Sequence, residues 1–269
     1  KIALVTGASS GIGAATAQRL AQAGYTVYGT SRRGSQAGAA AAAAGHAMLA
    51  LDVTSDASVA AAVAEVMRRE GRIDLLVNNA GFGVAPAGAE ESSVAQAQAI
   101  FDTNFYGVVR MTLAVLPHMR AQGGGRILNI GSVVGFLPMP YGALYSATKH
   151  AIEGYTESLD HEVRGWGIRA SVIEPAYTKT TFEANLLAPD TPLAAYRQVR
   201  AAVTSRLQAL MAGADDPAIV ADTVLAAAQA SQPKLRYTAG PLAARLRLMR
   251  RFLPAALLDA GLRKDLRLA

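Results

Sequence analysis

Short apolar runs alternate with longer segments of helical periodicity along most of this chain. The runs are rich in apolar and β-branched residues and predict strands: Ile2–Val5, Thr26–Thr30, Met48–Leu51, Leu75–Asn78, Arg126–Ile130 and Arg169–Ile173. Five segments with helical spacing lie between or after them: Ala14–Ala23, Ser58–Arg69, Val94–Met119, Tyr145–Arg164 and Pro217–Ala230. Strands that alternate with helices form right-handed crossovers and a parallel sheet. We therefore expect a single α/β domain over residues 1–269, a doubly wound parallel sheet of about seven strands with helices on both faces.

Composition agrees with one globular domain and narrows the chemistry. The 269 residues are 51% hydrophobic, enough for a large buried core. There is no cysteine, which excludes disulfides and thiolate metal sites, and the four histidines lack metal-ligand spacing, so we expect no metal. No run approaches the ~20 apolar residues of a membrane span, and no export signal precedes the first motif. We expect a cytoplasmic protein, with a plain surface helix or loop over the alanine-rich residues 34–45.

Positive charge gathers at the C-terminal end. The net charge is +6, and residues 234–269 alone carry nine Lys and Arg against two Asp. Residues 241–269 form a basic extension whose apolar positions have helical spacing: Leu242, Leu246, Met249 and Phe252. Three interpretations stay open, namely a cap over a substrate cleft, a weak peripheral contact with an anionic membrane, and a solvated helix with a packed underside. A charged groove with interleaved aromatics is absent, so nucleic acid is not an expected partner.

A glycine-punctuated turn follows the first predicted strand and opens the first predicted helix. Its glycines let the backbone turn tightly and bring the helix N-terminal amides against a pyrophosphate, where the helix dipole favours negative charge. The strand, glycine and helix context makes the motif far more specific than glycine spacing alone. We expect cofactor contacts from Gly7, Ser9, Ser10, Gly11, Ile12 and Gly13.

The end of the second strand indicates which dinucleotide binds. A dinucleotide fingerprint places an acidic residue about 20 residues on, to bond the ribose 2′-hydroxyl. Here Arg32 and Arg33 occupy that place, and no Asp or Glu occurs between Gly13 and Asp52. Arginine forks match a 2′-phosphate, so we expect NADP(H), preferred at least about tenfold over NAD(H). The alternative is a solvated arginine pair at a strand end.

Polar residues also follow the third and fourth strands. Asp52, with Val53 after it, offers an acceptor for the adenine amino group, or else an N-cap for the next helix. Asn79, Ala80 and Gly81 follow the fourth strand, where we expect them to line the cofactor, although such a run also marks turns.

Tyr145 and Lys149 stand four residues apart and share one face of a predicted helix. Lowering the pKa of a tyrosine from about 10 to about 7 takes roughly 4 kcal/mol. A cation at about 4 Å supplies that much at an effective dielectric constant of about 20, but only about 1 kcal/mol in water. The pair therefore predicts proton-transfer chemistry in a partly desolvated site.

Together these elements resemble the short-chain dehydrogenase/reductase family. Its Thr-Gly-x-x-x-Gly-x-Gly, Asn-Asn-Ala-Gly, Asn, Ser and Tyr-x-x-x-Lys elements occur in order over about residues 1–180. The resemblance implies a Rossmann fold with Tyr145 as acid/base and Ser132 hydrogen-bonded to the substrate oxygen. It also implies that Lys149 lowers the tyrosine pKa and holds the nicotinamide ribose, and that Asn104 completes a water-linked proton relay.

In the family, a Pro-Gly pair lies against the nicotinamide. This chain has Pro175-Ala176 at that place, and the alanine adds a methyl group. The resemblance implies that Tyr177 or Thr178 offers an amide to the carboxamide, with Thr180 on the phosphate side. Residues 131–180 look closest to the 17-beta-hydroxysteroid dehydrogenase and retinol dehydrogenase-like branch. That branch implies the 2′-phosphate role for Arg32, with Ser10 as a second contact.

Apolar side chains flank the catalytic elements, and we expect them to form the substrate walls: Val134, Phe136, Tyr141, Tyr177 and Phe182. Residues 176–212 are the expected substrate loop, with 176–190 as a candidate mobile lid. Such walls suit a hydrophobic ketone or secondary alcohol. An apolar core would show the same residues, so this stays a hypothesis.

The sequence therefore predicts an NADP(H)-dependent oxidoreductase for apolar carbonyl compounds. A ketoacyl carrier-protein reductase is the nearest alternative, although such enzymes usually end soon after the seventh strand. An alcohol dehydrogenase acting oxidatively is another, and a non-catalytic NADP(H)-sensing regulator belongs to a different class. By resemblance to the family we expect a homodimer or homotetramer.

Overall fold

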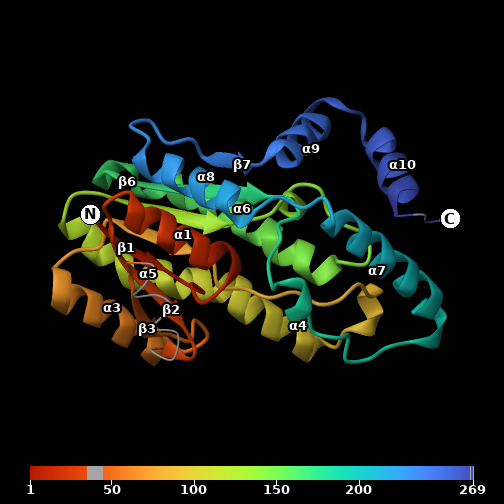
Figure 1. Cartoon of the computed structure of the whole chain (residues 1–269), viewed down its shortest axis with the longest axis horizontal. Coiled ribbons are helices and arrows are strands. Elements are labelled where there is room, and N and C mark those ends of the chain that lie inside the picture. The colour runs from red at the N-terminus through yellow and green to blue at the C-terminus, as the bar shows by residue number, and fades with distance from the viewer. Residues whose placement is uncertain (35–44, 267, 269) are drawn as a thin grey trace.

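Seven parallel strands form the centre of the computed structural model, which describes residues 1–34, 45–266 and 268 (Figure 1). Their bounds are β1 Ile2–Val5, β2 Thr26–Ser31, β3 Ala47–Ala50, β4 Leu75–Asn78, β5 Gly125–Ile130, β6 Ile168–Pro175 and β7 Arg236–Ala239. They lie in the order β3-β2-β1-β4-β5-β6-β7. The predicted doubly wound sheet is confirmed, and its order reverses between β1 and β4, the place where such sheets bind ligands. Most of the alanine-rich stretch 34–45 lies outside the described residues.

Helices cover both faces of the sheet because alternate strand residues point to opposite sides. Ile2 and Leu4 join one core with residues of three helices, and Ala3 and Val5 join a second core on the other face. The helices of the first face are α3 Asp56–Glu70, α5 Gly107–Ala121 and α6 Ala143–Val163. Those of the second face are α1 Gly11–Gln22 and α8 Pro217–Gln229, which lie side by side in Figure 1.

The sequence predicted one continuous helix over residues 94–119. That prediction was wrong, because the helix is interrupted. The segment consists of α4 Val94–Phe101, a π-helical turn at Asp102–Tyr106, and α5. The turn contains Asn104, whose side chain is held by a neighbouring loop, and π turns inside helices often mark functional positions. Gly107 then starts α5 against Val53, whose Cγ2 would lie 2.8 Å from a Cβ at Gly107.

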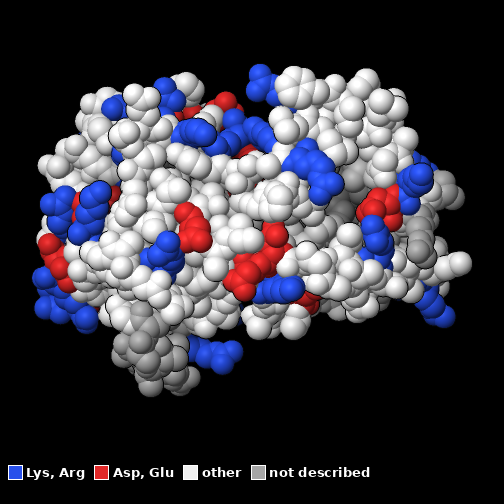
Figure 2. All heavy atoms as spheres, turned by 45° about the horizontal axis from the view of Figure 1, so that its top comes forward, with Lys and Arg blue, Asp and Glu red and all other residues white. Residues whose placement is uncertain are grey.

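Three further helices lie beyond the sheet at one end of the molecule: α7 Arg197–Met211, α9 Pro241–Phe252 and α10 Ala255–Asp265 (Figure 1). The apolar stripe predicted for the C-terminal helix holds only for its first half. Leu242 and Leu246 are half-buried, whereas Phe252 is 71% exposed. Basic and acidic side chains lie close to one another over the face drawn in Figure 2. Within the described part of the chain, none of the helices has the length and apolarity needed to cross a membrane.

Candidate active site

The glycines in the turn between β1 and α1 let neighbouring parts of the backbone lie close together. Gly7 has a positive φ of 66°, a conformation that few residues besides glycine adopt readily. A Cβ at Gly13 would clash with the carbonyl oxygen of Gly7 and lie 2.5 Å from Nδ2 of Asn79. The Asn79 Nδ2 donates to the carbonyl oxygens of Thr6, at 3.0 Å, and Gly7, at 3.1 Å. Asn79 therefore braces the turn, a role that its place after β4 did not reveal.

The N-terminus of α1 is open to an anion. Gly11 begins the helix, and its first turn holds no acidic residue. Ser9 and Ser10 are exposed, and the Ser10 hydroxyl does not cap its own helix. Ile12 is half-buried against the core of the second face, which leaves its backbone as the group available to a ligand. Free helix amides beside exposed hydroxyls suit a pyrophosphate.

Two arginines stand at the end of β2. Arg32 and Arg33 are exposed, and neither forms an ion pair with a residue that the structure describes. Asp52 lies near Arg32, and hydrogen bonds from Thr54, at 2.9 Å from its backbone N and 2.8 Å from its hydroxyl, hold the Asp52 pKa below its usual range. The alternative reading of Asp52 as an N-cap is wrong, because Ser55 caps α3.

Val53, Ala80 and Gly81 complete the predicted cofactor edge. Val53 is buried in the core, while Ala80 is half-buried and Gly81 exposed. Ala80 also donates its backbone N–H to the Thr6 hydroxyl at 3.0 Å. A Cβ at Gly81 would lie 3.0 Å from Oδ1 of Asn104. Ala80 and Gly81 therefore join the glycine turn to Asn104 across the switch point of the sheet.

Tyr145 lies in the first turn of α6, where the ring of Phe182 covers it at a centroid distance of 5.5 Å. Burial raises the pKa of the Tyr145 hydroxyl, and hydrogen bonding with Ser132 acts in the opposite direction. The resemblance implied a tyrosine pKa lowered by Lys149, and that role of Lys149 stays a prediction.

The amine of Lys149 points elsewhere. Its Nζ donates to the carbonyl oxygen of Ile130 at 2.8 Å and lies 5.5 Å from the centroid of the Tyr145 ring, over its face. Burial lowers the Lys149 pKa to about 8, and the nearby Glu153 carboxylate opposes this. The cation therefore lies between the end of β5 and the ring of Tyr145.

Asn104 is fully buried and ties two segments together. Its Oδ1 accepts from the backbone N–H of Phe82 at 3.0 Å, and its Nδ2 donates to the Phe82 carbonyl at 2.8 Å. Nδ2 also approaches the Thr148 hydroxyl at 3.3 Å, one turn along α6 from Tyr145. The side chain thus braces the loop after β4 against α6, and the relay implied for it stays a prediction.

Ser132 and Pro175 end neighbouring strands beside Tyr145. Ser132 follows β5 and accepts from the Val134 backbone N–H at 3.3 Å, which starts a short 3-10 turn at Val133–Gly135. Pro175 is the last residue of β6. Ala176 does not have a positive φ, so its extra methyl group introduces no backbone strain. The departure from Pro-Gly is therefore tolerated.

The segment after β6 folds back over this site. Thr180 packs on the glycine turn, 3.1 Å from the position of a Cβ on Gly11. The Thr178 hydroxyl donates to the Ala176 carbonyl at 3.2 Å. Phe182 reaches Gly83, where a Cβ would lie 3.1 Å from its Cζ. Two short β-bridges anchor the segment, one between Thr178 and Asp215 and one between Leu187 and Val84.

The predicted substrate walls share one property, because all of them are half-buried rather than part of the closed core: Val134, Phe136, Tyr141, Tyr177 and Phe182. Tyr141 has a φ of 63°, a conformation that strains a bulky residue. Strained residues of this kind cluster at functional sites. Of these residues, Phe182 contacts Tyr145 and Val134 contacts Ser132, and the role of all five as substrate walls stays a prediction.

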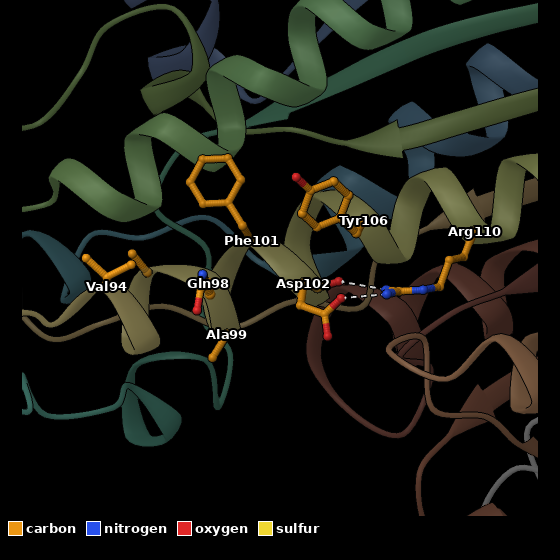
Figure 3. A pocket seen from close by; sticks show the side chains of 8 residues that line it. Val94, Gln98, Ala99, Phe101, Asp102, Tyr106 and Arg110 are labelled. Carbon is orange, nitrogen blue, oxygen red and sulfur yellow. Dashed lines mark hydrogen bonds and ion pairs between the residues drawn. The ribbon is translucent and has the colours of Figure 1, made fainter.

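A surface hollow lies elsewhere, on the outer side of α4 and α5. It measures about 680 Å³ and is lined by Val94, Ala97, Gln98, Ala99, Phe101, Asp102, Tyr106 and Arg110. Figure 3 shows the guanidinium of Arg110 pointing at the Asp102 carboxylate, which it meets at 2.7 Å. The hollow holds none of the catalytic candidates, so it belongs to a surface rather than to the chemical site.

Four buried or half-buried charges behind the site escaped the sequence reasoning. Arg236 of β7 donates to Glu153 at 2.8 Å, and Arg247 of α9 donates to Glu174 at 2.9 Å. Burial, together with the nearby Glu153, raises the pKa of Glu174 to about 7. Only Glu153 gave a signal in the sequence, because it follows Lys149 by four residues on the same helix face.

Comparison with known proteins gives matches over most or all of the chain. The family model described as short chain dehydrogenase matches residues 1–190. An uncharacterized oxidoreductase of Bacillus subtilis, YusZ, is 35% identical over 99% of this chain and 98% of its own. A short-chain dehydrogenase from Streptomyces avermitilis has a TM-score of 0.82 at 33% identity, covering 98% of this chain and 95% of that one.

Several relatives carry named activities. The 3-ketodihydrosphingosine reductase of Bacteroides thetaiotaomicron is 43% identical over 69% of this chain and 66% of its own length. Human 17-beta-hydroxysteroid dehydrogenase type 1 is 37% identical over 88% of this chain and 76% of its own. Human retinol dehydrogenase 8 is 41% identical over 69% of this chain and 61% of its own length.

Structural neighbours bind nicotinamide cofactors of both kinds. A 3-ketoacyl-(acyl-carrier-protein) reductase of Brucella melitensis in complex with NADH has a TM-score of 0.76 at 27% identity, covering 88% of this chain and 96% of that one. A serine dehydrogenase in complex with NADP⁺ has a TM-score of 0.77 at 29% identity, covering 90% and 95%. These neighbours support a nicotinamide dinucleotide without distinguishing NAD from NADP.

Proposed function

Because the chain belongs to the short-chain dehydrogenase/reductase family, we propose that it is an NADP(H)-dependent oxidoreductase for hydrophobic ketones and secondary alcohols. Its family membership confirms the resemblance read from the sequence motifs and makes it an oxidoreductase of the CH–OH type. The observation that carries the proposal is the contact of Tyr145 with Ser132 on one side and with the apolar ring of Phe182 on the other.

In this proposal Tyr145 exchanges the proton and the chain's other residues orient the substrate. A phenol whose pKa is raised by burial is protonated at neutral pH, which suits the donation of a proton to a carbonyl oxygen during reduction. Ser132 offers its hydroxyl to the same oxygen. Lys149, whose pKa burial lowers to about 8, carries a positive charge at neutral pH close to the phenol ring. When bound, a nicotinamide supplies the hydride.

The residues around the glycine turn fit such a cofactor. A Cβ would fill the space at Gly13, and the open amides of α1 begin at Gly11. The exposed Arg32 and Arg33 would hold the 2′-phosphate, with Ser10 as a second contact. Asp52 would meet the adenine, and Pro175 and Thr178 would lie at the nicotinamide end.

The NADP(H) preference is tested by removing one arginine at a time. We expect kcat/KM with NADPH to exceed that with NADH at least about tenfold, because a hydrogen bond between charged groups contributes about 1.5–3 kcal/mol. Arg32→Ala should remove most of this preference by lowering kcat/KM for NADPH while leaving that for NADH unchanged. Arg33→Ala is the matched comparison. Equal rates with both cofactors in the wild type, followed at 340 nm, would end the NADP(H) assignment.

The substrate class is tested with a panel of steroid, retinoid, aliphatic and aromatic ketones. The half-buried apolar walls favour such compounds, and one relative is by name a reductase of a long-chain ketone. Tyr145→Phe should remove turnover with the best substrate. Wild-type rates in that variant would refute the role of Tyr145. A carrier-protein-linked ketoacyl substrate belongs in the panel, because a ketoacyl carrier-protein reductase is among the structural neighbours.

We also propose that the chain forms a homodimer or homotetramer through the face of α4 and α5. Val94, Tyr106 and Leu113 are 74%, 51% and 63% exposed on this face, beside the hollow of Figure 3. Exposed apolar side chains beside a hollow are typical of protein contacts. Leu113→Glu should lower the mass measured by light scattering, whereas a monomeric wild type would refute the proposal.

We also propose that the protein is cytoplasmic and that it makes a weak contact with anionic lipid. Leu248, Phe252 and Leu257 are 59%, 71% and 59% exposed on α9 and α10, next to the exposed Arg250 and Arg251. An apolar strip with arginines beside it suits the surface of an anionic membrane. Flotation with phosphatidylserine vesicles at low salt measures it. Failure of the protein to float there would remove this part.

A further inference from the structure

Helix α9 contacts the strand β6 and the turn after Ser132 through Arg247. Its Nη1 donates to Glu174 Oε1 at 2.9 Å, and its guanidinium lies over the ring of Phe136, 4.9 Å from the centroid. Glu174 is fully buried one residue before the end of β6, and Phe136 directly follows the short turn that Ser132 begins. Arg247 thus joins three elements that are far apart in the sequence.

The buried carboxylate fixes where the guanidinium lies. Glu174 belongs to the sheet, and its position is set by the pairing of β6 with β5 and β7. Arg236, 3.7 Å from Glu174 Oε1, and Glu153 of α6 are the other charged groups that face Glu174. Because its acceptor does not move, the guanidinium of Arg247 is held in one position. Its flat face then contacts the aromatic ring of Phe136.

The backbone of Phe136 is held by the turn in which the residue lies. It lies in a short turn held by backbone hydrogen bonds from Gly135 to Ser132, from Phe136 to Val133 and from Leu137 to Val133. The side chain is half-buried. The guanidinium of Arg247 adds a contact with the face of this half-buried ring.

We propose that Arg247 is a positioning residue for the substrate: anchored on Glu174, it holds Phe136 and so sets the outer wall of the substrate cleft. The proposal rests on the proposed function for its substrate, and it gives the basic C-terminal extension a role in the site. Because the contact acts on a wall and not on the reacting atoms, it affects the KM for large substrates rather than kcat.

The kinetic test compares Arg247→Met with Arg245→Met. Methionine keeps much of the apolar stem but removes the ion pair and the contact with the ring. Arg245 is exposed on the same helix and makes no ion pair within the described residues, so it is the matched control. We expect Arg247→Met to raise the KM for a long-chain methyl ketone about tenfold, as for the loss of a charged hydrogen bond. The KM for a short-chain methyl ketone, the KM for NADPH and kcat should change less than about twofold.

Two further variants separate positioning from a general loss of structure. Arg247→Lys restores the charge, so it should recover part of the loss. Phe136→Leu and the double variant Phe136→Leu/Arg247→Met complete a double-mutant cycle. If Arg247 acts through Phe136, the double variant loses no more than the worse single variant. Additive losses, or equal losses for long and short ketones, would overturn the proposal.

Hydrogen–deuterium exchange tests the contact without any substrate. The amides of Gly135, Phe136 and Leu137 should exchange at least about tenfold faster in Arg247→Met than in Arg245→Met. Unchanged exchange overturns the inference whatever the kinetics show. Faster exchange with no effect on any KM overturns the role in substrate binding. If the wild type turns over no ketone, the proposed function fails, while the exchange result still decides whether Arg247 holds Phe136.

Discussion

Replacing Lys149 by methionine should stabilise the protein while removing its activity. The amine is buried, and burial lowers its pKa from the ordinary 10.5 to about 8. That difference corresponds to about 3 kcal/mol by which the charged amine destabilises the folded state. The variant also loses the hydrogen bond to Ile130 and the contact with the Tyr145 ring, together about 1–2 kcal/mol. The net gain is about 1–2 kcal/mol, or a rise in Tm of about 4 °C.

The pH dependence of this gain identifies its cause. Below pH 8 Lys149 is charged in both the folded and unfolded states, so the wild type bears the full destabilisation. Between about pH 8 and 10.5 the folded amine is neutral while the unfolded one is still charged, and the destabilisation fades as pH rises. The difference in free energy of unfolding between Lys149→Met and wild type should therefore shrink towards zero or below it over that range.

Urea denaturation at several pH values, without cofactor, measures the difference. Lys234→Met is the control, because Lys234 is exposed and the substitution does not change a buried charge. A Lys149→Met variant that is less stable than wild type at pH 7 would refute the reasoning. A difference that does not change from pH 7 to 10.5 would do the same.

Three more changes have expected outcomes. Gly13→Ala places a Cβ against the Gly7 carbonyl. The affinity for NADPH, measured by calorimetry, should therefore fall at least about tenfold. An unchanged affinity would contradict the close approach of Gly13 to the Gly7 carbonyl. Asp160→Asn leaves two arginines without their buried partner and should cost about 3–5 kcal/mol in urea denaturation at pH 7. Because those partners lower the Asp160 pKa to about 2, its contribution should be lost as pH falls from about 3.8 towards 2. Phe182→Ala exposes the Tyr145 phenol to water and should lower its pKa in a spectroscopic titration, whereas an unchanged pKa would contradict the role of the ring.

The strands and the glycine turn could be predicted because their causes are local. Apolar runs bounded by polar residues reproduce β1 to β6, whereas β7, Arg236–Ala239, is not such a run, and the spacing of Gly7 and Gly13 is a direct mark of the first turn. The break at Asn104 could not be predicted, because it depends on the Phe82 backbone, which lies 22 residues away. Helical spacing alone continues through that position.

The electrostatics of the site were less accessible to sequence reasoning. Spacing places Lys149 one turn from Tyr145, but it does not give the direction of the amine, which the carbonyl of Ile130 determines. Glu174 lies in a strand whose partners come from α6, β7 and α9. A pKa depends on all of these neighbours, so it follows only from the folded structure.

The two β-bridges over the site have a kinetic consequence. Four backbone hydrogen bonds hold the segment after β6, two to Asp215 and two to residues 83–85. Breaking all four takes about 2–6 kcal/mol, so the fully open form makes up about 3% of the molecules or less. In the proposed function, a ligand bound beneath the segment leaves through that rare form. The rate of opening then sets an upper limit on turnover, whatever the speed of the chemical step.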